Sequence, residues 1–145
     1  MNENKSKTKP APTYYARCYN KQCTKAENCL RHIAMLHTTA DTPFINAVNP
    51  DSFPADTTTC PYYQSAQKIH LAWGITHLLD KVPFIDGQAI RSLLISHFGK
   101  SQYYRFHRHE RPLRPEDQAY IRQVFRRKGI TDEPVFDSYS DEYDW

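Results

Sequence analysis

Four cysteines are the residues whose type and spacing in this sequence best suit chemistry. Four residues separate Cys18 from Cys23, five separate Cys23 from Cys29, and thirty separate Cys29 from Cys60. Thiolates are soft ligands, and four of them suit a tetrahedral zinc ion with no open coordination position, which is a structural geometry and not a catalytic one. The surrounding segment is weakly apolar, so metal binding would supply folding energy that it lacks. The spacing therefore predicts a structural zinc site of Cys18, Cys23, Cys29 and Cys60.

Other states of these cysteines remain open. An iron–sulfur cluster also takes four cysteine ligands, and a ligand followed by proline, as in Cys60-Pro61, recurs in such proteins. Reduced thiols can instead fill space as small apolar side chains. Two disulfides would form in an oxidising compartment.

The N-terminal residues point to a reducing compartment. Residues 1–9 are polar and lack the apolar run of a signal peptide. No stretch approaches the roughly 18 apolar residues that cross a bilayer. We therefore expect a soluble, cytoplasmic protein without a membrane span, whose thiols stay reduced.

Sequence signatures of an enzyme are missing. The chain has only four glycines and no Gly-rich phosphate loop, no Gly-x-Ser-x-Gly and no His-Glu-x-x-His. His107, His109 and Glu110 could serve as acid–base groups, but they lie among basic residues at a predicted helix end. Contact with solvent or with phosphate is the simpler role for them. We expect a binding protein and not an enzyme.

Charge is distributed unevenly along the second half of the chain. Residues 91–128 contain ten Lys or Arg and three acids, a net charge of +7 (10 − 3), whereas residues 130–145 contain six acids and no Lys or Arg. A basic segment of this length favours a polyanion through counterion release. Nucleic acid is therefore the expected partner, and the acidic end either folds back on the basic segment or stays in solvent. Solvated charged faces of a helix bundle are the alternative explanation.

Apolar spacing predicts helices on both sides of the last cysteine. Leu30, Ile33 and Leu36 indicate a short helix within residues 29–37. Helices are also predicted over residues 65–80, 86–98 and 102–109, followed by a fourth that begins at Pro115 and stops at Gly129. Asp86 and Ser101 are the predicted N-caps of the second and third. Trp73, Leu79, Val124 and Phe125 should be buried between the first and the fourth.

These elements define the expected architecture. Residues 1–12 form a disordered tail, and residues 13–129 form a single, mainly α domain. In it, a loop-rich, cysteine-stapled module (13–63) packs on a small bundle of about four helices (64–129). Residues 130–145 form an extended acidic and aromatic arm.

Two resemblances add to this interpretation. The segment from Phe98 to Phe106, followed by Glu110-Arg-Pro-Leu113 and the basic helix, resembles bacterial repressor-type and transposase-type helix-turn-helix proteins over residues 86–129. This resemblance implies a turn at Gly99 and a recognition helix over residues 102–109, with a plain helical hairpin as the alternative. In such an arrangement arginine reads guanine or clamps phosphate, and glutamine pairs with adenine. The expected nucleic-acid contacts are Lys100, Gln102, Arg105, Arg108, Arg111, Arg122, Arg126 and Arg127.

Across nearly the whole chain, the sequence also looks like an uncharacterised bacterial family of unknown function. The cysteine cluster with Cys60-Pro61, the segment from Ala72 to Leu79, the segment from Glu110 to Leu113 and the ending from Asp141 to Trp145 carry this likeness. It implies no activity. The sequence as a whole predicts a metal-stabilised nucleic-acid-binding protein, for instance a regulator. The alternatives are a protein-interaction adaptor or an iron–sulfur electron carrier or sensor.

Overall fold

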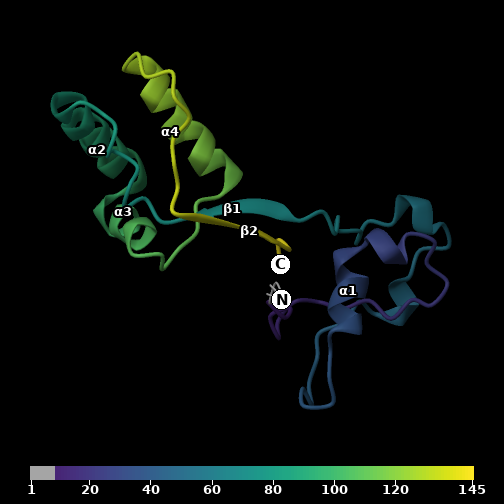
Figure 1. Ribbon diagram of the computed structural model, residues 1–145. Helices are drawn as coiled ribbons and strands as arrows, with labels where there is room; N and C mark the ends of the chain where they lie inside the picture. Colours follow the sequence, from purple (N-terminus) through teal and green to yellow (C-terminus); the bar gives the residue numbers. More distant parts are fainter. Residues whose placement is uncertain (1–8) are drawn as a thin grey trace, which may run out of the picture. The chain divides into compact units, whose positions relative to one another are not determined.

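Helices and one small sheet make up the regular structure of residues 9–145, the part of the chain that the structure, a computed structural model, describes (Figure 1). Four α-helices and a two-stranded sheet occur there. The predicted helical content is therefore confirmed only in part, because the sheet makes the fold a mixed one. None of the described helices combines the length and the apolar character needed to cross a membrane.

The chain divides into two units. One, which we call the cysteine unit, contains the chain up to Lys68 together with Glu142–Trp145, and the other, the helical unit, is Ile69–Asp141. Residues 1–8 of the predicted disordered tail lie outside the described residues. Pro12, the last residue of that predicted tail, accepts a backbone hydrogen bond from Tyr15.

The cysteine unit consists of short turns around one short helix. Helix α1 spans Leu30–Leu36 and confirms the helix predicted within residues 29–37. The 3₁₀ turns of this unit are η1 (Ala26–Asn28), η2 (Pro50–Ser52) and η3 (Thr57–Thr59). Among its described residues the buried apolar side chains are Cys29, Leu30 and Ala34. So small a core contributes little hydrophobic stabilisation.

Arg17 joins several segments of this unit through hydrogen bonds. It is 4% exposed, and its Nη1 donates to the carbonyls of Tyr15 (2.6 Å), Pro12 (3.0 Å) and Thr13 (3.2 Å). Its Nε donates to Thr38 Oγ1 at 2.9 Å. A buried charge is tolerated only when hydrogen bonds replace its hydration. Arg17 therefore fastens the incoming chain to the segment that follows α1.

In the helical unit, strand β1 (Ile69–Trp73) lies where the sequence predicted a helix over residues 65–80. Strand β2 (Ser138–Glu142) pairs with β1, and Ala72 exchanges two backbone hydrogen bonds with Leu113. Both partners lie far along the chain, where hydrophobic periodicity cannot reveal them. The helix prediction is wrong because long-range backbone pairing outweighs a local apolar pattern.

Gln118 links the strand to the helices. Its side-chain Nε2 donates to the carbonyls of His70 and Leu113, each at 3.0 Å, and the residue is buried. Gln118 lies on helix α4, His70 on β1, and Leu113 in the segment just before α4. One amide group therefore holds three parts of the unit together.

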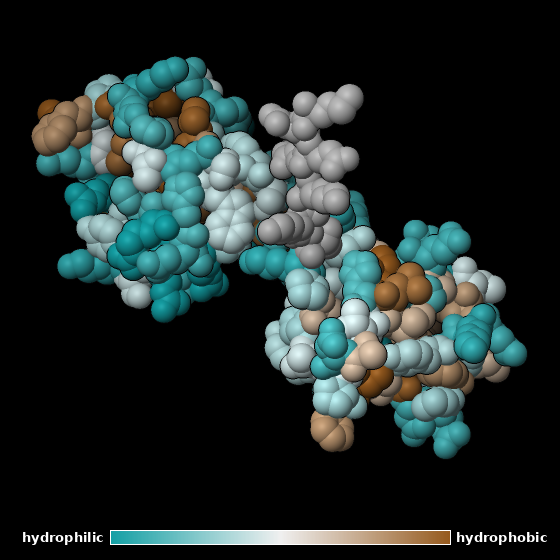
Figure 2. Space-filling view, turned by 60° about the horizontal axis from the view of Figure 1, so that its bottom comes forward, coloured by the Kyte–Doolittle hydropathy of each residue, from teal (hydrophilic) through white to brown (hydrophobic). Residues whose placement is uncertain are grey.

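Three helices enclose the core of the helical unit. They are α2 (Phe84–Phe98), α3 (Lys100–His107) and α4 (Pro115–Arg127). The buried side chains are Ala72, Ile75, Leu78, Ile90, Leu94, Tyr103, Phe106, Leu113, Ile121, Val124, Phe125 and Phe136. Val124 and Phe125 are buried as predicted, whereas Trp73 and Leu79 are half-buried. The face seen in Figure 2 is mostly hydrophilic, with small hydrophobic patches.

The starts of α2 and α3 differ from the predicted ones. α2 begins at Phe84 after Pro83, so Asp86 lies in its first turn and is not its N-cap. α3 begins at Lys100 directly after Gly99, so Ser101 is not a cap either. Gly99 has φ +88°, a conformation that only glycine adopts easily. A turn does occur at Gly99, as expected, and the third helix starts two residues earlier than predicted.

α4 follows its sequence signals closely. It begins at Pro115 as predicted, and the side chain of Asp117 accepts a hydrogen bond from the backbone N–H of Arg114 at 3.0 Å. Gly129, just beyond the helix, has φ +75°. Local end signals and the apolar stripe agree here, so the fourth helix could be placed from sequence alone.

We predict that Gln118→Ala destabilises the protein by about 2 kcal/mol, because the buried carbonyl of Leu113 and the part-buried carbonyl of His70 lose their shared donor. Gln123→Ala, on the exposed side of the same helix, is the matched control and should change stability by less than about 0.5 kcal/mol. Urea unfolding followed by circular dichroism measures both. Equal effects of the two variants would refute the linking role of Gln118.

Candidate functional site

The four cysteines line one cavity in the cysteine unit. Cys29 immediately precedes α1, and Cys60 immediately follows η3. The backbone N–H of Cys18 donates to the carbonyl of Arg31, which holds this loop near α1, and that of Cys23 donates to the carbonyl of Asn20 in a local turn. All four line the same cavity, so segments far apart in the sequence bring their thiols around one space.

The size and lining of this cavity suit a single ion. Its volume is about 20 Å³, which is the space that one water-sized particle needs. Lys25 and Arg31 also line it. Four thiolates around a divalent cation carry a net negative charge, so two nearby cations would stabilise such a centre.

The thiols surround this space without closing on it. Within residues 9–145, no group of three or more His, Cys, Asp or Glu side chains is close enough together to hold a metal ion as they stand. All four cysteines are free thiols. Burial raises the pKa of Cys18, and the nearby thiols of Cys29, Cys23 and Cys60 raise it further. The four thiols therefore share one cavity without standing as a preformed metal-ligand group.

The predicted nucleic-acid contacts fall into two groups. One, which we call the α3 face, consists of Lys100, Arg105, Arg108 and Arg111, all exposed. On α3, Tyr103 and Phe106 are buried and Arg105 is exposed, while Arg108 and Arg111 follow the end of the helix. Glu110 pairs with Arg108 at 2.9 Å, which leaves the α3 face a net charge of +3 (4 − 1).

The second group lies on α4, and the acidic arm partly neutralises it. Glu133 pairs with Arg122 at 2.7 Å and approaches Arg126 at 3.9 Å. Arg127 is exposed. The C-terminal end of α4 lies away from α3 in Figure 1. Glu133 of the acidic end thus folds back on the basic segment, which is the first of the two predicted arrangements.

Gln102 differs from the other predicted contacts. It is half-buried, and its Oε1 lies out of solvent with no hydrogen-bond partner among the described residues. Gly99 alone connects α2 to α3, whereas a DNA-binding helix-turn-helix has a turn of about three to four residues. This geometry places Gln102 against the protein and not on the α3 face.

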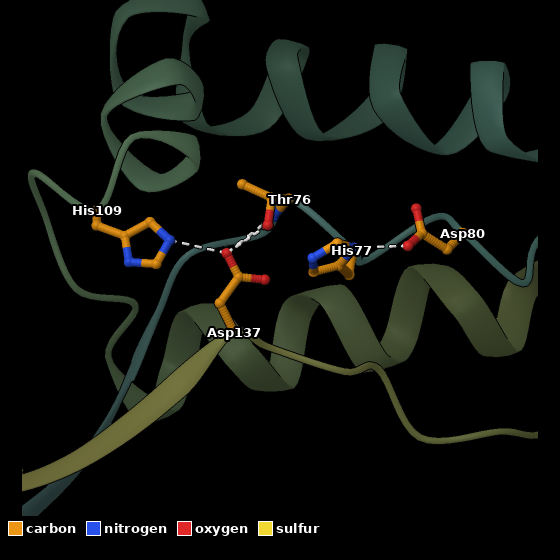
Figure 3. Close-up of polar contacts among 5 residues, drawn as sticks. All are labelled: Thr76, His77, Asp80, His109 and Asp137. Carbon is orange, nitrogen blue, oxygen red and sulfur yellow. Dashed lines mark hydrogen bonds and ion pairs between the residues drawn. The ribbon is translucent and has the colours of Figure 1, made fainter.

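Sequence reasoning missed a cluster around Asp137 (Figure 3). Asp137 Oδ2 accepts a hydrogen bond from the hydroxyl of Thr76 at 2.6 Å and lies 2.8 Å from His109 Nε2. The Asp137 side chain is 11% exposed, and its Oδ1 has no hydrogen-bond partner among the described residues. Burial pushes the pKa of Asp137 up, but the hydrogen bonds from Thr76 and His109 outweigh it and hold the pKa below its ordinary value.

Two backbone conformations make room for this cluster. Gly74 has φ +82°, and a Cβ there would collide with both His109 Nε2 and Asp137 Oδ2. His109 itself has φ +61°, which is uncommon for a residue with a side chain. Asp137 also donates its backbone N–H to the carbonyl of Gly74. The arm is thereby attached to the segment that follows β1.

Little in the sequence could have revealed this cluster. His109 was interpreted as a solvated residue at a helix end, and Asp137 as one acid among six in the arm. The pair forms only because β2 lies beside β1, a pairing that the sequence does not indicate. A second pair, His77 with Asp80 at 2.7 Å, joins residues three apart in a turn and is exposed.

We predict that Asp137→Asn weakens the dependence of stability on pH in acid. Because the folded pKa of Asp137 is depressed, its stabilisation is fully present above the ordinary aspartate pKa and is lost as the pH falls through the folded value. Urea unfolding between about pH 6 and pH 3 measures this. Asp132→Asn, at an exposed position, is the control. If both variants follow the wild-type curve, the cluster contributes nothing.

Comparison with known proteins places the chain in a family. No curated protein and no solved structure matches it. A family model described as a family of unknown function (DUF6078) matches residues 1–145, the whole chain. This agrees with the likeness noted from the cysteines and the aromatic ending, and the protein belongs to the DUF6078 family.

Proposed function

We propose that this protein is a metal-stabilised nucleic-acid-binding protein. One zinc ion, held by Cys18, Cys23, Cys29 and Cys60, stabilises the cysteine unit, and the α3 face of the helical unit contacts the phosphates of a nucleic acid. The observation that carries the proposal is that all four cysteines, with Lys25 and Arg31, line one ion-sized cavity.

The weak core of the cysteine unit supports the metal part of the proposal. Its buried apolar side chains are few, and two of its 3₁₀ turns are capped by Asn49 and Asp56 and not packed around apolar residues. A structural zinc ion supplies folding energy directly to such segments. Zinc would also lower the pKa of the thiols, because the bound cation favours thiolates.

We predict about one zinc ion per chain, as expected for a closed four-thiolate site. Cys18→Ser and Cys60→Ser should each lose the metal and melt at a lower temperature, whereas His37→Ala, an exposed histidine of the same unit, should keep it. Elemental analysis and thermal melting with and without a chelator measure these outcomes.

Other results would exclude the zinc centre. A brown protein that contains iron and sulfide after anaerobic purification would establish the iron–sulfur alternative. A metal-free protein whose melting temperature does not respond to a chelator would leave the cysteines as space-filling thiols.

The α3 face supports the nucleic-acid part of the proposal. Lys100, Arg105 and Arg111 form no ion pair with a carboxylate among the described residues, so their charges are available to phosphates. Contacts of this kind give affinity without base specificity, and they position a protein on the backbone. Glu133 pairs with Arg122 and Arg126, so the charges of these two α4 arginines are less available to phosphates.

We predict salt-dependent binding to duplex or single-stranded DNA or RNA. Changing Lys100, Arg105 or Arg111 to Gln should each reduce the slope of log K against log salt by about 0.7–0.9. Glu133→Gln should strengthen binding, because it releases Arg122 and Arg126. Fluorescence anisotropy with labelled oligonucleotides measures these effects, and Lys21→Gln in the cysteine unit is the charge-matched control. If no salt-dependent binding occurs at low ionic strength, the nucleic-acid part fails.

A protein-interaction adaptor is the second candidate, and one observation favours it. Phe84 and Ile85 at the start of α2 are 77% and 80% exposed, which is unusual for neighbouring large apolar residues. Because the arm contains β2, deleting residues 130–145 would damage the sheet. Phe84→Ser with Ile85→Ser is therefore the cleaner test: an adaptor loses its partner, while nucleic-acid binding through the α3 face is unaffected.

A further inference from the structure

A second cavity lies within the helical unit, between the segment after β1 and helices α2 and α3. Its volume is about 300 Å³, which is at the small end of the range for ligand sites. Ile75, Thr76 and Leu79 line it from the segment after β1, Arg91 from α2, and Tyr103, Tyr104 and His107 from α3. No aspartate or glutamate is among the described residues that line it.

Arg91 gives this cavity a permanent positive charge. Its Nη2 donates to the Tyr104 hydroxyl at 2.6 Å, and the hydroxyl of Tyr103 lies close enough to the guanidinium to affect its pKa as well. No carboxylate of the described residues pairs with Arg91. Because arginine pairs readily with planar or tetrahedral oxyanions, an unneutralised guanidinium on a cavity wall favours an anionic ligand.

The tyrosines add hydroxyl groups to the same cavity lining. Tyr104 accepts a hydrogen bond from Arg91, so its own hydroxyl proton is available to another acceptor. Burial raises the pKa of Tyr103, so its hydroxyl keeps its proton. His107 contributes an imidazole N–H. One guanidinium, two hydroxyls and one imidazole can donate hydrogen bonds to several acceptor oxygens of a phosphate monoester, and the guanidinium offsets part of its charge.

Thr76 contributes a different polar group to the lining. Its hydroxyl donates a hydrogen bond to Asp137 at 2.6 Å. The Thr76 oxygen can therefore only accept a hydrogen bond from a ligand in the cavity. The negative charge of Asp137 behind it disfavours an anion on that side. A ligand hydroxyl group suits this position, and Ile75 and Leu79 add apolar side chains to the cavity lining.

We propose that this cavity binds an organic phosphate monoester, with the phosphate at Arg91, Tyr104 and His107 and a ligand hydroxyl group at Thr76. A free nucleotide and the phosphorylated end of a nucleic acid both present this chemistry. The site uses none of the residues of the α3 face. The inference rests on the proposed function only if the natural ligand is the end of a nucleic acid, and it is independent of it if the ligand is a free nucleotide.

Isothermal titration of the full-length protein with adenosine 5′-monophosphate tests the proposal, with adenosine and inorganic phosphate as comparison probes. The nucleotide should bind more tightly than either comparison probe. Arg91→Gln should weaken it about tenfold or more, the loss expected for a charged hydrogen-bond partner, and Tyr104→Phe about fivefold. Lys81→Gln, at an exposed lysine outside the cavity, is the matched control and should bind as the wild type does.

Anisotropy with one oligonucleotide, with and without a 5′-phosphate, separates the two sources. An Arg91-dependent preference for the phosphorylated form assigns the site to nucleic-acid ends, and its absence, with nucleotide binding retained, assigns it to free nucleotides. The proposal is overturned if the nucleotide fails to bind at about 1 mM, if adenosine binds equally well, or if Arg91→Gln and Lys81→Gln behave alike. Oligonucleotide binding that ignores Arg91 but requires Lys100 and Arg105 would leave the proposed function standing.

Discussion

The backbone pairing of β1 is the constraint on which the helical unit depends. This five-residue strand pairs with β2 and, through Ala72, with Leu113, while Gln118 donates to carbonyls on both β1 and the segment before α4. These bonds fix where the segment after β1 leaves the sheet. The same segment provides Thr76 to the Asp137 cluster and to the second cavity. Both polar sites of the helical unit therefore follow from one short strand.

The cysteine unit is stabilised differently from the helical unit. Its described buried side chains are Arg17, Cys29, Leu30 and Ala34, so hydrogen bonds to carbonyls must replace much of what a core would provide. A segment of this kind gains most from a central ion. The helical unit has a continuous apolar core and no such need. The two units thus differ as the proposed function requires: the cysteine unit would hold the metal, and the helical unit presents the exposed basic side chains.

The sequence predicted what local signals encode. α4 could be placed because Pro115, the apolar stripe and Gly129 all mark one helix, and the short helix α1 followed from three apolar residues. β1 could not be placed, because its apolar spacing also fits a helix and its pairing partners lie far along the sequence. Cysteine type and spacing indicated candidate ligands, but only the folded chain brings Lys25 and Arg31 to the same cavity. His109 and Asp137 gave no signal, since their contact depends on the strand pairing that the periodicity hid.

The cysteine unit is discontinuous in sequence, because Glu142–Trp145 belong to it together with the residues before Ile69. Trp145 contacts the ring of Tyr15 at 5.3 Å and donates its indole N–H to the carbonyl of Lys9. During synthesis the residues of the helical unit are therefore added to the chain before the last residues of the cysteine unit. The synthesis of the cysteine unit thus begins before that of the helical unit and ends after it. Its four cysteines are in the chain before the unit is complete.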